Sequence, residues 1–287
     1  MIAVRAFAKI NLDLRIIGGL AGGYHELRTT FQSIALHDRL TFTITRGPWV
    51  IESDDPACPV DGNIVERAAS LVWKASGRSG SPAGIRVRIE KRIPVTAGLG
   101  GGSADAAAAL PALTRLWRVR LSPSQLREMA ASLGADVPFF LVGGMARGIG
   151  RGDVLTPLAD RPRRWVVVAT PPFGVSTKDA YRWFDEADTA THVGRPRRGP
   201  HPLNDLQPPV AARHPQIGQL IDELRRHGAS PAAMSGSGSA VFGLFARLSS
   251  AEAAADALVG HGRRVLITET LSRHEHRRLS RPVLARK

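Results

Sequence analysis

Four glycines fall within five residues of a segment that joins a predicted strand to a predicted helix. The segment Lys91–Leu110 reads KRIPVTAGLGGGSADAAAAL. Glycine accepts positive φ values and lets the backbone approach a ligand closely. The helix after such a loop offers unpaired N–H groups and the positive end of its dipole, which favours a bound anion such as phosphate. We therefore expect a phosphate-binding loop; a plain flexible turn, the alternative, does not need so many glycines next to a helix.

Two widespread nucleotide-binding motifs do not describe this loop. The motif GxxxxGK[ST] requires a Lys after its last glycine, and none of the four glycines precedes a Lys. The motif GxGxxG fails because Ser103 stands where the third glycine belongs. The sequence thus predicts a phosphate-binding loop that belongs to neither of these two motifs.

Length and composition indicate a folded, soluble protein. The 287 residues correspond to about two domains, and 43% of them are hydrophobic, close to the globular average. The lone cysteine, Cys58, excludes an intramolecular disulfide and a thiolate-rich metal site. No apolar run reaches the roughly 20 residues that span a bilayer, and Arg5 and Lys9 interrupt the apolar stretch that a signal peptide needs. The sequence predicts a cytoplasmic protein with no membrane segment.

Strands and helices follow one another without strict alternation, which favours an α+β architecture over a doubly wound sheet. A turn at Gly47–Pro48 is expected to join two paired strands, the glycines of residues 18–23 to form a loop, and Pro111 to kink its helix. Ala187–Pro202 lacks periodicity and is expected to be a loop. The expected strands are Ile2–Ile16, Arg39–Thr45, Trp49–Glu52, Ile85–Ile89, Trp165–Thr170, Ala240–Phe245 and Arg264–Thr268. The expected helices are Ile64–Ala75, Ala104–Leu116, Ser122–Ser132, Lys178–Phe184, Gln216–His227 and Ala251–Val259.

The formal net charge of +14 raises the question of nucleic-acid binding. Thr191–Pro200 contributes +3 through three arginines, and Leu271–Lys287 contributes +5 through five arginines and one lysine against Glu275. Neither stretch is expected to lie inside a folded element. Eight of the 14 net charges lie in these two stretches, so the net charge is only weak evidence for nucleic-acid binding. Nucleic acid is therefore not an expected partner.

Several motifs follow one another along the chain in the order found in one enzyme family. The glycine-rich loop resembles the phosphate loop of the GHMP kinases, which include galactokinase and the homoserine, mevalonate and phosphomevalonate kinases. Ala6–Ile34 (AFAKINLDLRIIGGLAGGYHELRTTFQSI) and Leu133–Gly144 (LGADVPFFLVGG) resemble the branch of this family that acts on cytidine diphosphate-linked methylerythritol. Met234–Phe245 (MSGSGSAVFGLF) and Asn204–Leu206 (NDL) are also similar to family motifs. The resemblance spans about Met1–Phe245.

This resemblance implies the two-domain GHMP kinase fold. Residues 1–158 would form an N-terminal domain like ribosomal protein S5 domain 2, with the phosphate loop. Residues 159–287 would form a ferredoxin-like C-terminal domain that ends in a basic tail from about residue 272, dispensable for chemistry. The implied reaction is the phosphorylation of the substrate's 2-hydroxyl with ATP and Mg²⁺, in the non-mevalonate route to isoprenoid precursors, by a monomer or homodimer.

Lys9 and Asp136 are the catalytic residues that the resemblance implies. The Asp of GADVPFF would accept the proton of the substrate hydroxyl, and the Lys of AKINL would lie beside it. Phosphoryl transfer depends on an oriented nucleophile and on neutralised phosphate charge, so the pair is chemically reasonable. The structural alternatives are a surface lysine at a strand end and a helix-capping aspartate.

The same resemblance implies two groups of binding residues. ATP contacts are expected from Pro94, Val95, Thr96, Ala97, Gly98, Leu99, Gly100, Gly101, Gly102, Ser103 and Ala104, with Asn63 and Lys91 near the adenine. Contacts to the cytidine diphosphate moiety are expected from Asn11, Tyr24, His25, Thr177 and Tyr181. An imidazole and an amide can hydrogen-bond to the edge of cytosine, and an aromatic ring can stack on it. The alternative for Tyr181 is an ordinary core residue.

Four further residues have open roles. Ser103 could contact a phosphate or Mg²⁺, cap the helix, or do both, and Asp105 has no assignable role. Gly236 and Gly238 are expected to allow a tight turn packed against the phosphate loop, although a purely structural role is nearly as good an interpretation. The remaining histidines show no metal-ligand spacing.

Two departures from the family pattern concern the substrate loop. Phe7 stands where the family usually has Pro, and Gly22 stands where Asp is common, so the shape of this loop is expected to differ. Two other functions remain open. A GHMP kinase with a smaller alcohol as substrate is disfavoured by Tyr24–His25 and the GADVPFF motif, and a nucleic-acid-binding protein on an S5-like fold is supported by charge alone.

Overall fold

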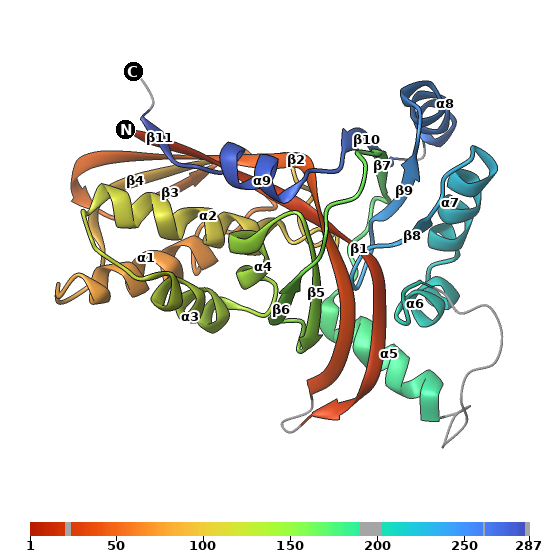
Figure 1. The fold of residues 1–287 in the computed structure, drawn as a ribbon, viewed down its shortest axis with the longest axis horizontal. Coiled ribbons are helices and arrows are strands. Elements are labelled where there is room, and N and C mark those ends of the chain that lie inside the picture. The colour runs from red at the N-terminus through yellow and green to blue at the C-terminus, as the bar shows by residue number, and fades with distance from the viewer. Residues whose placement is uncertain (21–23, 190–202, 261, 285–287) are drawn as a thin grey trace.

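The computed structural model describes residues 1–20, 24–189, 203–260 and 262–284, and the structural statements below concern these ranges. They form two sheets with their helices, arranged side by side along the long axis of the molecule (Figure 1). Thr191–Pro200 and Gly22 lie outside the described residues. Within the described ranges, no helix has the length and apolarity needed to cross a membrane.

Two long strands organise the first sheet. β1 (Ile2–Leu20) and β2 (Tyr24–Pro48) pair antiparallel along almost their whole length, with a register shift between Phe7 and Lys9. The other strands are β3 (Val50–Ser53), β4 (Ala83–Glu90), β5 (Met145–Gly150), β6 (Val154–Pro157) and β11 (Val283–Leu284). Their order is β11-β1-β2-β4-β3, with β5 pairing with both β2 and β6.

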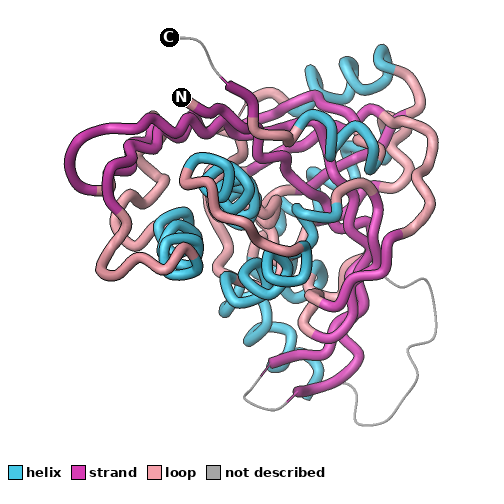
Figure 2. The backbone as a smooth tube through the Cα atoms, turned by 60° about the vertical axis from the view of Figure 1, so that its left-hand side comes forward, coloured by secondary structure: helices cyan, strands magenta, loops and turns pink. Residues whose placement is uncertain are grey.

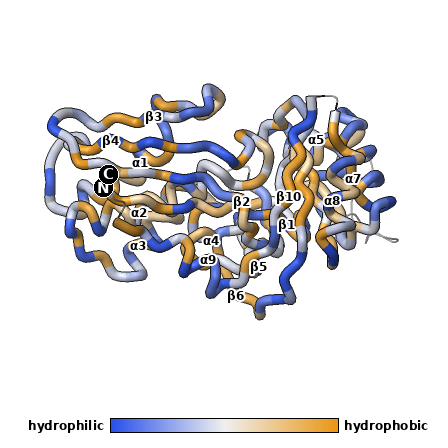
Figure 3. Tube along the Cα trace, turned by 90° about the horizontal axis from the view of Figure 1, so that it is seen from above, coloured by the Kyte–Doolittle hydropathy of each residue, from blue (hydrophilic) through white to orange (hydrophobic). Residues whose placement is uncertain are grey.

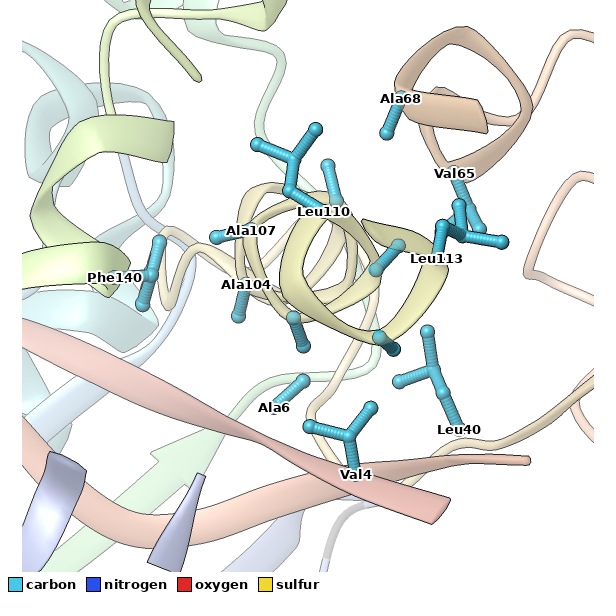
Figure 4. Packing of buried hydrophobic residues seen from close by; sticks show 14 of the residues in the cluster. Val4, Ala6, Leu40, Val65, Ala68, Ala104, Ala107, Leu110, Leu113 and Phe140 are labelled. Carbon is cyan, nitrogen blue, oxygen red and sulfur yellow. The ribbon is translucent and has the colours of Figure 1, made fainter. Parts of the chain in front are cut away.

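Helices pack on one side of this sheet around a central, alanine-rich helix. They are α1 (Ile64–Ala75), α2 (Gly101–Leu116), α3 (Pro123–Leu133) and α4 (Val137–Val142). The small side chains of Ala104 and Ala107 let α2 approach its neighbours closely, and Val4 and Leu40 meet it from the sheet (Figure 4). Burial of this apolar cluster holds α2, and with it the end of the glycine loop, in a fixed position.

The second sheet is antiparallel and apolar on both faces. Its order is β10-β7-β9-β8, formed by β7 (Trp165–Thr170), β8 (Ala232–Met234), β9 (Val241–Phe245) and β10 (Arg264–Glu269). Side chains alternate between the two faces of a strand. Val167 packs with helices of this half, whereas Val166 packs with Ala8, Ile10 and Ile34 of β1 and β2. The helices are α5 (Thr177–Thr189), α6 (Gln207–Arg213), α7 (Pro215–Arg226) and α8 (Leu248–Leu258).

The long strands therefore connect the two halves. Seen from above, β1, β2 and β10 lie between the helices of the first half and α5, α7 and α8 of the second (Figure 3). This arrangement confirms the predicted α+β class. It also explains why residues from the beginning of β1 and from the turn after β8 meet at one place.

Three local predictions need correction. Trp49–Glu52 was expected to pair with Arg39–Thr45, but β4 lies between them: Val87 pairs with Phe42 on one side and, in parallel, with Ile51 on the other. β4 thereby has its backbone paired at both edges, and its apolar side chains are buried in the core of the first half. β1 also continues through the first glycines of residues 18–23 as far as Leu20. Finally, α2 begins at Gly101, three residues earlier than expected, and continues through Pro111.

The basic C-terminal stretch is folded, contrary to expectation. Ser272 caps α9 (Arg273–Leu279) through a capping box with Glu275, in which each side chain bonds to the other residue's backbone N–H. β11 then adds to the edge of β1 and brings the C-terminal segment next to the N-terminus (Figure 2). The tail thus packs on the first half of the molecule although it follows the second in sequence.

Phe7 belongs to this tail contact rather than to the substrate loop. Its ring lies 5.1 Å from that of His37 and 5.5 Å from that of His276, measured between ring centroids. His276 is buried on α9, and its Nε2–H donates a 3.0 Å hydrogen bond to the carbonyl oxygen of Phe140. Phe7 therefore helps to dock α9 against the first sheet.

Deleting Ser272–Lys287 is expected to lower the free energy of unfolding by about 3 kcal/mol, because Phe7 and the end of α4 would be exposed and β1 would lose its short pairing with β11. Thermal unfolding followed by circular dichroism measures the change. The matched control is a chain that ends at Leu284, which keeps α9 and β11 and should unfold like the full chain. An unchanged midpoint for the longer deletion would contradict the packing role.

Candidate active site

The glycine loop turns sharply before α2 and leaves the start of that helix open. Thr96, Gly98 and Gly100 have φ values of +54°, +77° and +73°. Gly100 occupies the N-cap position of α2 and supplies no side-chain hydrogen bond to the helix. The first N–H groups of an α-helix have no partner within the helix, so they remain available to an anion. Ser103 is the third residue of α2 and not its cap.

The turn after β8 packs directly against this loop. The hydroxyl of Ser235 donates a 3.0 Å hydrogen bond to the carbonyl oxygen of Gly98, and the N–H of Ala240 donates a 3.1 Å bond to that of Ala97. Gly236 and Gly238 have φ values of +55° and +87°, so both need the left-handed region. The prediction that these glycines form a turn against the phosphate loop is confirmed.

Gly98→Ala is expected to destabilise the protein by about 2 kcal/mol or more. A Cβ at Gly98 would lie 2.1 Å from the carbonyl oxygen of Ser235, and the positive φ adds backbone strain. Gly102→Ala is the matched control, because its Cβ would meet only Ile64 Cγ2, at 3.8 Å. Chemical denaturation measures both. Equal stability of the two variants would show that the close approach of Gly98 to Ser235 does not matter for the stability of the fold.

A buried lysine joins the glycine loop to a carboxylate. The Nζ of Lys9 donates hydrogen bonds of 2.6 Å to Asn11 Oδ1 and 2.9 Å to the carbonyl oxygen of Gly98, and it lies 3.5 Å from Asp136 Oδ2. The backbone N–H of Lys9 also donates to the carbonyl oxygen of Leu99, at 3.0 Å. The side chain of Lys9 is 4% exposed and that of Asp136 is 36% exposed. The ammonium is therefore enclosed, whereas the carboxylate opens to solvent.

Both structural alternatives for this pair are wrong. Lys9 lies within β1 and its side chain is buried, so it is not a surface lysine at a strand end. Asp136 occupies the N-cap position of α4, but its side chain makes no capping hydrogen bond. Its carboxylate instead faces Lys9. A charged pair that helix capping does not explain fits a functional role.

A second lysine is buried beneath the loop between two carboxylates. Lys91 Nζ bonds to Asp38 Oδ2 and, at 2.9 Å, to Asp105 Oδ2, and these three side chains are at most 3% exposed. Asp38 also accepts hydrogen bonds from the backbone N–H groups of Arg92 and Ile93, at 2.6 and 2.8 Å. Asp105 Oδ1 is buried and has no hydrogen-bond partner.

The environment of this cluster shifts the pKa values of Lys91 and Asp105. Burial raises the pKa of the Asp105 carboxyl, and the nearby Asp38 charge acts in the same direction against the attraction of Lys91. Burial alone would lower the pKa of Lys91, but the charges of Asp105 and Asp38 outweigh it and raise that pKa. The two carboxylates and the lysine are thus electrostatically coupled directly behind the first turn of α2.

The side chains of the two predicted adenine residues are engaged within the protein. Lys91 is enclosed by the two carboxylates. Asn63 caps α1: its Oδ1 accepts a 2.9 Å hydrogen bond from the N–H of Val65, and its Nδ2 donates to the carbonyl oxygen of Pro59 at 2.6 Å. The structure therefore places both side chains in the framework around the loop.

Two predicted substrate residues meet face to face. The rings of His25 on β2 and Tyr181 on α5 stack with centroids 4.8 Å apart and an interplanar angle of 23°. His25 Nε2 lies 2.7 Å from Asp185 Oδ1. Burial raises the pKa of the Tyr181 hydroxyl, and the negative charge of Asp136 adds to that increase. The stack therefore lies within electrostatic range of the candidate catalytic carboxylate.

The other predicted substrate residues have separate surroundings. Asn11 uses its Oδ1 for Lys9 and its Nδ2 for Thr29 Oγ1, at 2.8 Å. Thr177 Oγ1 lies 3.1 Å from Ser237 Oγ, which links the start of α5 to the turn after β8. Tyr24 is 58% exposed and lies under the guanidinium of Arg151, 5.7 Å from the ring centroid. Neighbouring strand residues point to opposite faces, which separates Tyr24 from the adjacent His25.

Several residues of the site were not predicted from the sequence. Ser235 and Ser237 lie in the MSGSGS motif, where their alternation with glycine was a signal, because short hydroxyl side chains are typical of tight turns next to a phosphate loop. Asp38 and Asp185 carried no local signal. Their partners, Lys91 and His25, are 53 and 160 residues away in the chain.

Comparison with protein families assigns the class. A model of the N-terminal domain of GHMP kinases matches residues 63–144, and a model of their C-terminal domain matches residues 181–264. The first match contains the glycine loop and Asp136, and the second contains the turn after β8. The chain belongs to the GHMP kinase family, and it is an ATP-dependent kinase.

Individual relatives narrow the assignment. The chain is 41% identical to the 4-diphosphocytidyl-2-C-methyl-D-erythritol kinase of Pelotomaculum thermopropionicum, with 95% of this chain and 99% of that protein covered. It is 39% identical to the enzyme of the same name from Moorella thermoacetica, with 94% and 99% covered. The crystal structure of a 4-(cytidine 5'-diphospho)-2C-methyl-D-erythritol kinase has a TM-score of 0.77 at 36% identity and covers 93% of this chain and 98% of the other. Within the GHMP kinases, the chain falls in this group.

Proposed function

We propose that the protein transfers the γ-phosphoryl group of ATP to the 2-hydroxyl of 4-diphosphocytidyl-2-C-methyl-D-erythritol, giving the 2-phosphate and ADP in the non-mevalonate route to isoprenoid precursors. The names of its full-length relatives support the substrate. One structural observation carries the chemistry: a single buried ammonium, Lys9 Nζ, contacts both the glycine loop and the carboxylate of Asp136.

Asp136 serves as the general base in this proposal. Its carboxylate accepts the proton of the 2-hydroxyl as that oxygen attacks the γ-phosphorus and ADP leaves. Lys9 holds the carboxylate in place and stabilises the negative charge that develops on the attacking oxygen. Asn11 and the carbonyl oxygen of Gly98 fix the ammonium, so its position does not depend on substrate.

The glycine loop and the first turn of α2 hold the phosphates of ATP. Within Pro94–Ala104, the first three residues of α2, Gly101–Ser103, supply backbone N–H groups and the positive end of the helix dipole. Pro94 has no N–H, and the N–H of Ala104 already bonds to the carbonyl oxygen of Gly100. Ser103, whose hydroxyl hydrogen-bonds to none of the described residues, lies in that first turn. No group of three or more His, Cys, Asp or Glu in the described ranges could hold a metal alone. These residues fit a Mg²⁺ held mainly by phosphate oxygens, with Ser103 as a protein ligand. When bound, the ion neutralises phosphate charge.

In this proposal the cytosine lies beside the stack of His25 and Tyr181. If Nε2–H of His25 donates to Asp185, then Nδ1 is the acceptor nitrogen of the neutral ring and can receive a hydrogen bond from the cytosine amino group. Tyr181 supplies an aromatic face, and Asn11 and Thr177 contribute polar groups, Asn11 beside Lys9 and Thr177 beside Ser237. Tyr24 would contact the cytidine diphosphate moiety from the opposite face of β2.

Turnover with competing alcohols tests the proposal. We expect ATP-dependent phosphorylation of 4-diphosphocytidyl-2-C-methyl-D-erythritol and no measurable turnover of homoserine or mevalonate, measured as ADP release and by mass spectrometry of the product. Phosphorylation of a small alcohol in place of the cytidine compound would assign the protein to another GHMP activity. Absence of any turnover, together with salt-sensitive RNA or DNA binding, would favour the nucleic-acid alternative.

A further inference from the structure

A hollow of about 490 Å³ lies beside α9, on a part of the surface that the proposed reaction does not use. Its volume falls in the range of small-molecule binding sites, roughly 300–1,000 Å³. Its lining consists of Asp160, Arg273, His274, Arg277, Arg278 and Arg281.

The lining is strongly positive. Four arginines face one carboxylate, so the net charge is +3 with His274 neutral. Asp160 is partly satisfied already, because its Oδ2 accepts a 3.0 Å hydrogen bond from the backbone N–H of Arg273. Like charges four residues apart on a helix repel each other, and Arg273 and Arg277 have this spacing. Such a concentration of one charge is costly to the fold unless an anion neutralises it.

Two of the arginines are anchored and two are not. Arg273 donates through Nη2 to the carbonyl oxygens of Met145 and Leu158, at 2.7 and 2.8 Å, and its Nε is buried without a partner. Arg277 Nε donates to the carbonyl oxygen of Val142 at 3.1 Å. The anchored side chains of Arg273 and Arg277 thus give the hollow a fixed base.

Arg278 and Arg281 provide the available charge. Both are exposed, and neither makes an ion pair or hydrogen bond with any residue in the described part of the chain. A guanidinium presents parallel N–H groups that match two phosphate oxygens, so several arginines around one hollow suit a ligand with more than one phosphate group.

The hollow is separate from the catalytic pair. Asp136 stands before the first residue of α4, whereas Arg277 contacts Val142 at the last. Six helical residues at about 1.5 Å each place these ends about 9 Å apart. No residue of the glycine loop or of the His25–Tyr181 stack lines the hollow.

We propose that this hollow is a second anion site that binds a small diphosphate-bearing metabolite. A hollow of limited volume lined by four arginines fits a compact ligand, whereas a nucleic-acid site requires a positive stripe that follows the backbone. The site would make the enzyme responsive to a diphosphate compound that is not bound at the glycine loop.

Calorimetric titration of the full-length protein with inorganic pyrophosphate at low ionic strength tests the proposal. R278Q/R281Q is expected to weaken one class of pyrophosphate sites by about tenfold or more, because two charge-assisted contacts are lost. R88Q/R127Q removes two exposed arginines elsewhere and is the charge-matched control, expected to bind like the parent. Both variants should keep the parent's unfolding midpoint and ADP affinity.

Three outcomes overturn the proposal. Equal pyrophosphate binding by all three proteins would assign that binding to the glycine loop. Inorganic phosphate binding as tightly as pyrophosphate would reduce the effect to general charge screening. A single-stranded oligonucleotide that binds through Arg278 and Arg281 while pyrophosphate does not would assign the surface to nucleic acid.

Discussion

Asp136→Asn is expected to lower kcat by about 10³-fold while the affinity for ATP stays nearly unchanged. The amide keeps the size of the side chain but cannot accept the proton of the attacking hydroxyl. Its position at the start of α4 does not depend on the carboxylate, because the side chain makes no capping hydrogen bond. Loss of kcat without loss of fold or nucleotide binding is therefore the signature of the general-base role.

Steady-state kinetics and calorimetric ADP binding, measured on the same preparation, separate the two effects. Asp222→Asn on α7 is the matched control, since this side chain is 67% exposed and its ion pair is with Arg225, three residues away on the same helix. The control should retain the parent's kcat. Equal turnover by Asp136→Asn and the parent would remove Asp136 from the catalytic role, and a large loss of ADP affinity would make it a nucleotide ligand instead.

Local signals allowed a good part of the site to be predicted. The bounds of α1 at Ile64 and Ala75 and of β7 at Trp165 and Thr170 agree with the structure, because apolar periodicity and turn residues mark them in the sequence. The glycine loop was recognisable because glycines next to a helix start carry their own physical meaning. The structure then brings Lys9 and Asp136 to 3.5 Å, as the combined motifs implied.

Long-range contacts account for what could not be predicted. The insertion of β4 between β2 and β3 depends on burial of both its edges, which no turn signal at Gly47–Pro48 records. The C-terminal stretch contains so many arginines that it resembles a solvated tail, yet one histidine and a two-residue strand dock it. Asp38 is similarly hidden, since a buried aspartate is recognisable only through the lysine that neutralises it.

Lys91→Met is expected to destabilise the protein by about 3–5 kcal/mol at neutral pH. The variant removes the ammonium that lies between the carboxylates of Asp38 and Asp105, and both groups remain buried with no counterion. Lys74→Met, on the exposed last turn of α1, is the matched control and should be nearly neutral. Urea denaturation at fixed pH measures the difference, and a Lys91 variant as stable as the control would contradict the pairing.

The pH dependence of that variant identifies the cause. The pKa of Asp105 is already raised by burial in the parent, so this group contributes more stability when it is protonated and loses that contribution as pH rises through the folded-state pKa. Without Lys91 the pKa rises further, so the deficit of the variant should grow as pH rises from about 8 to about 10, because Asp105 ionises over this range in the folded parent and stays protonated in the folded variant. Adding Asp105→Asn to Lys91→Met removes the titrating group. The double variant should then recover part of the stability at pH 8 and depend less on pH. A deficit that stays constant with pH, in single and double variants alike, would mean that lost packing of the lysine stem, and not uncompensated charge, destabilises the base of the phosphate loop.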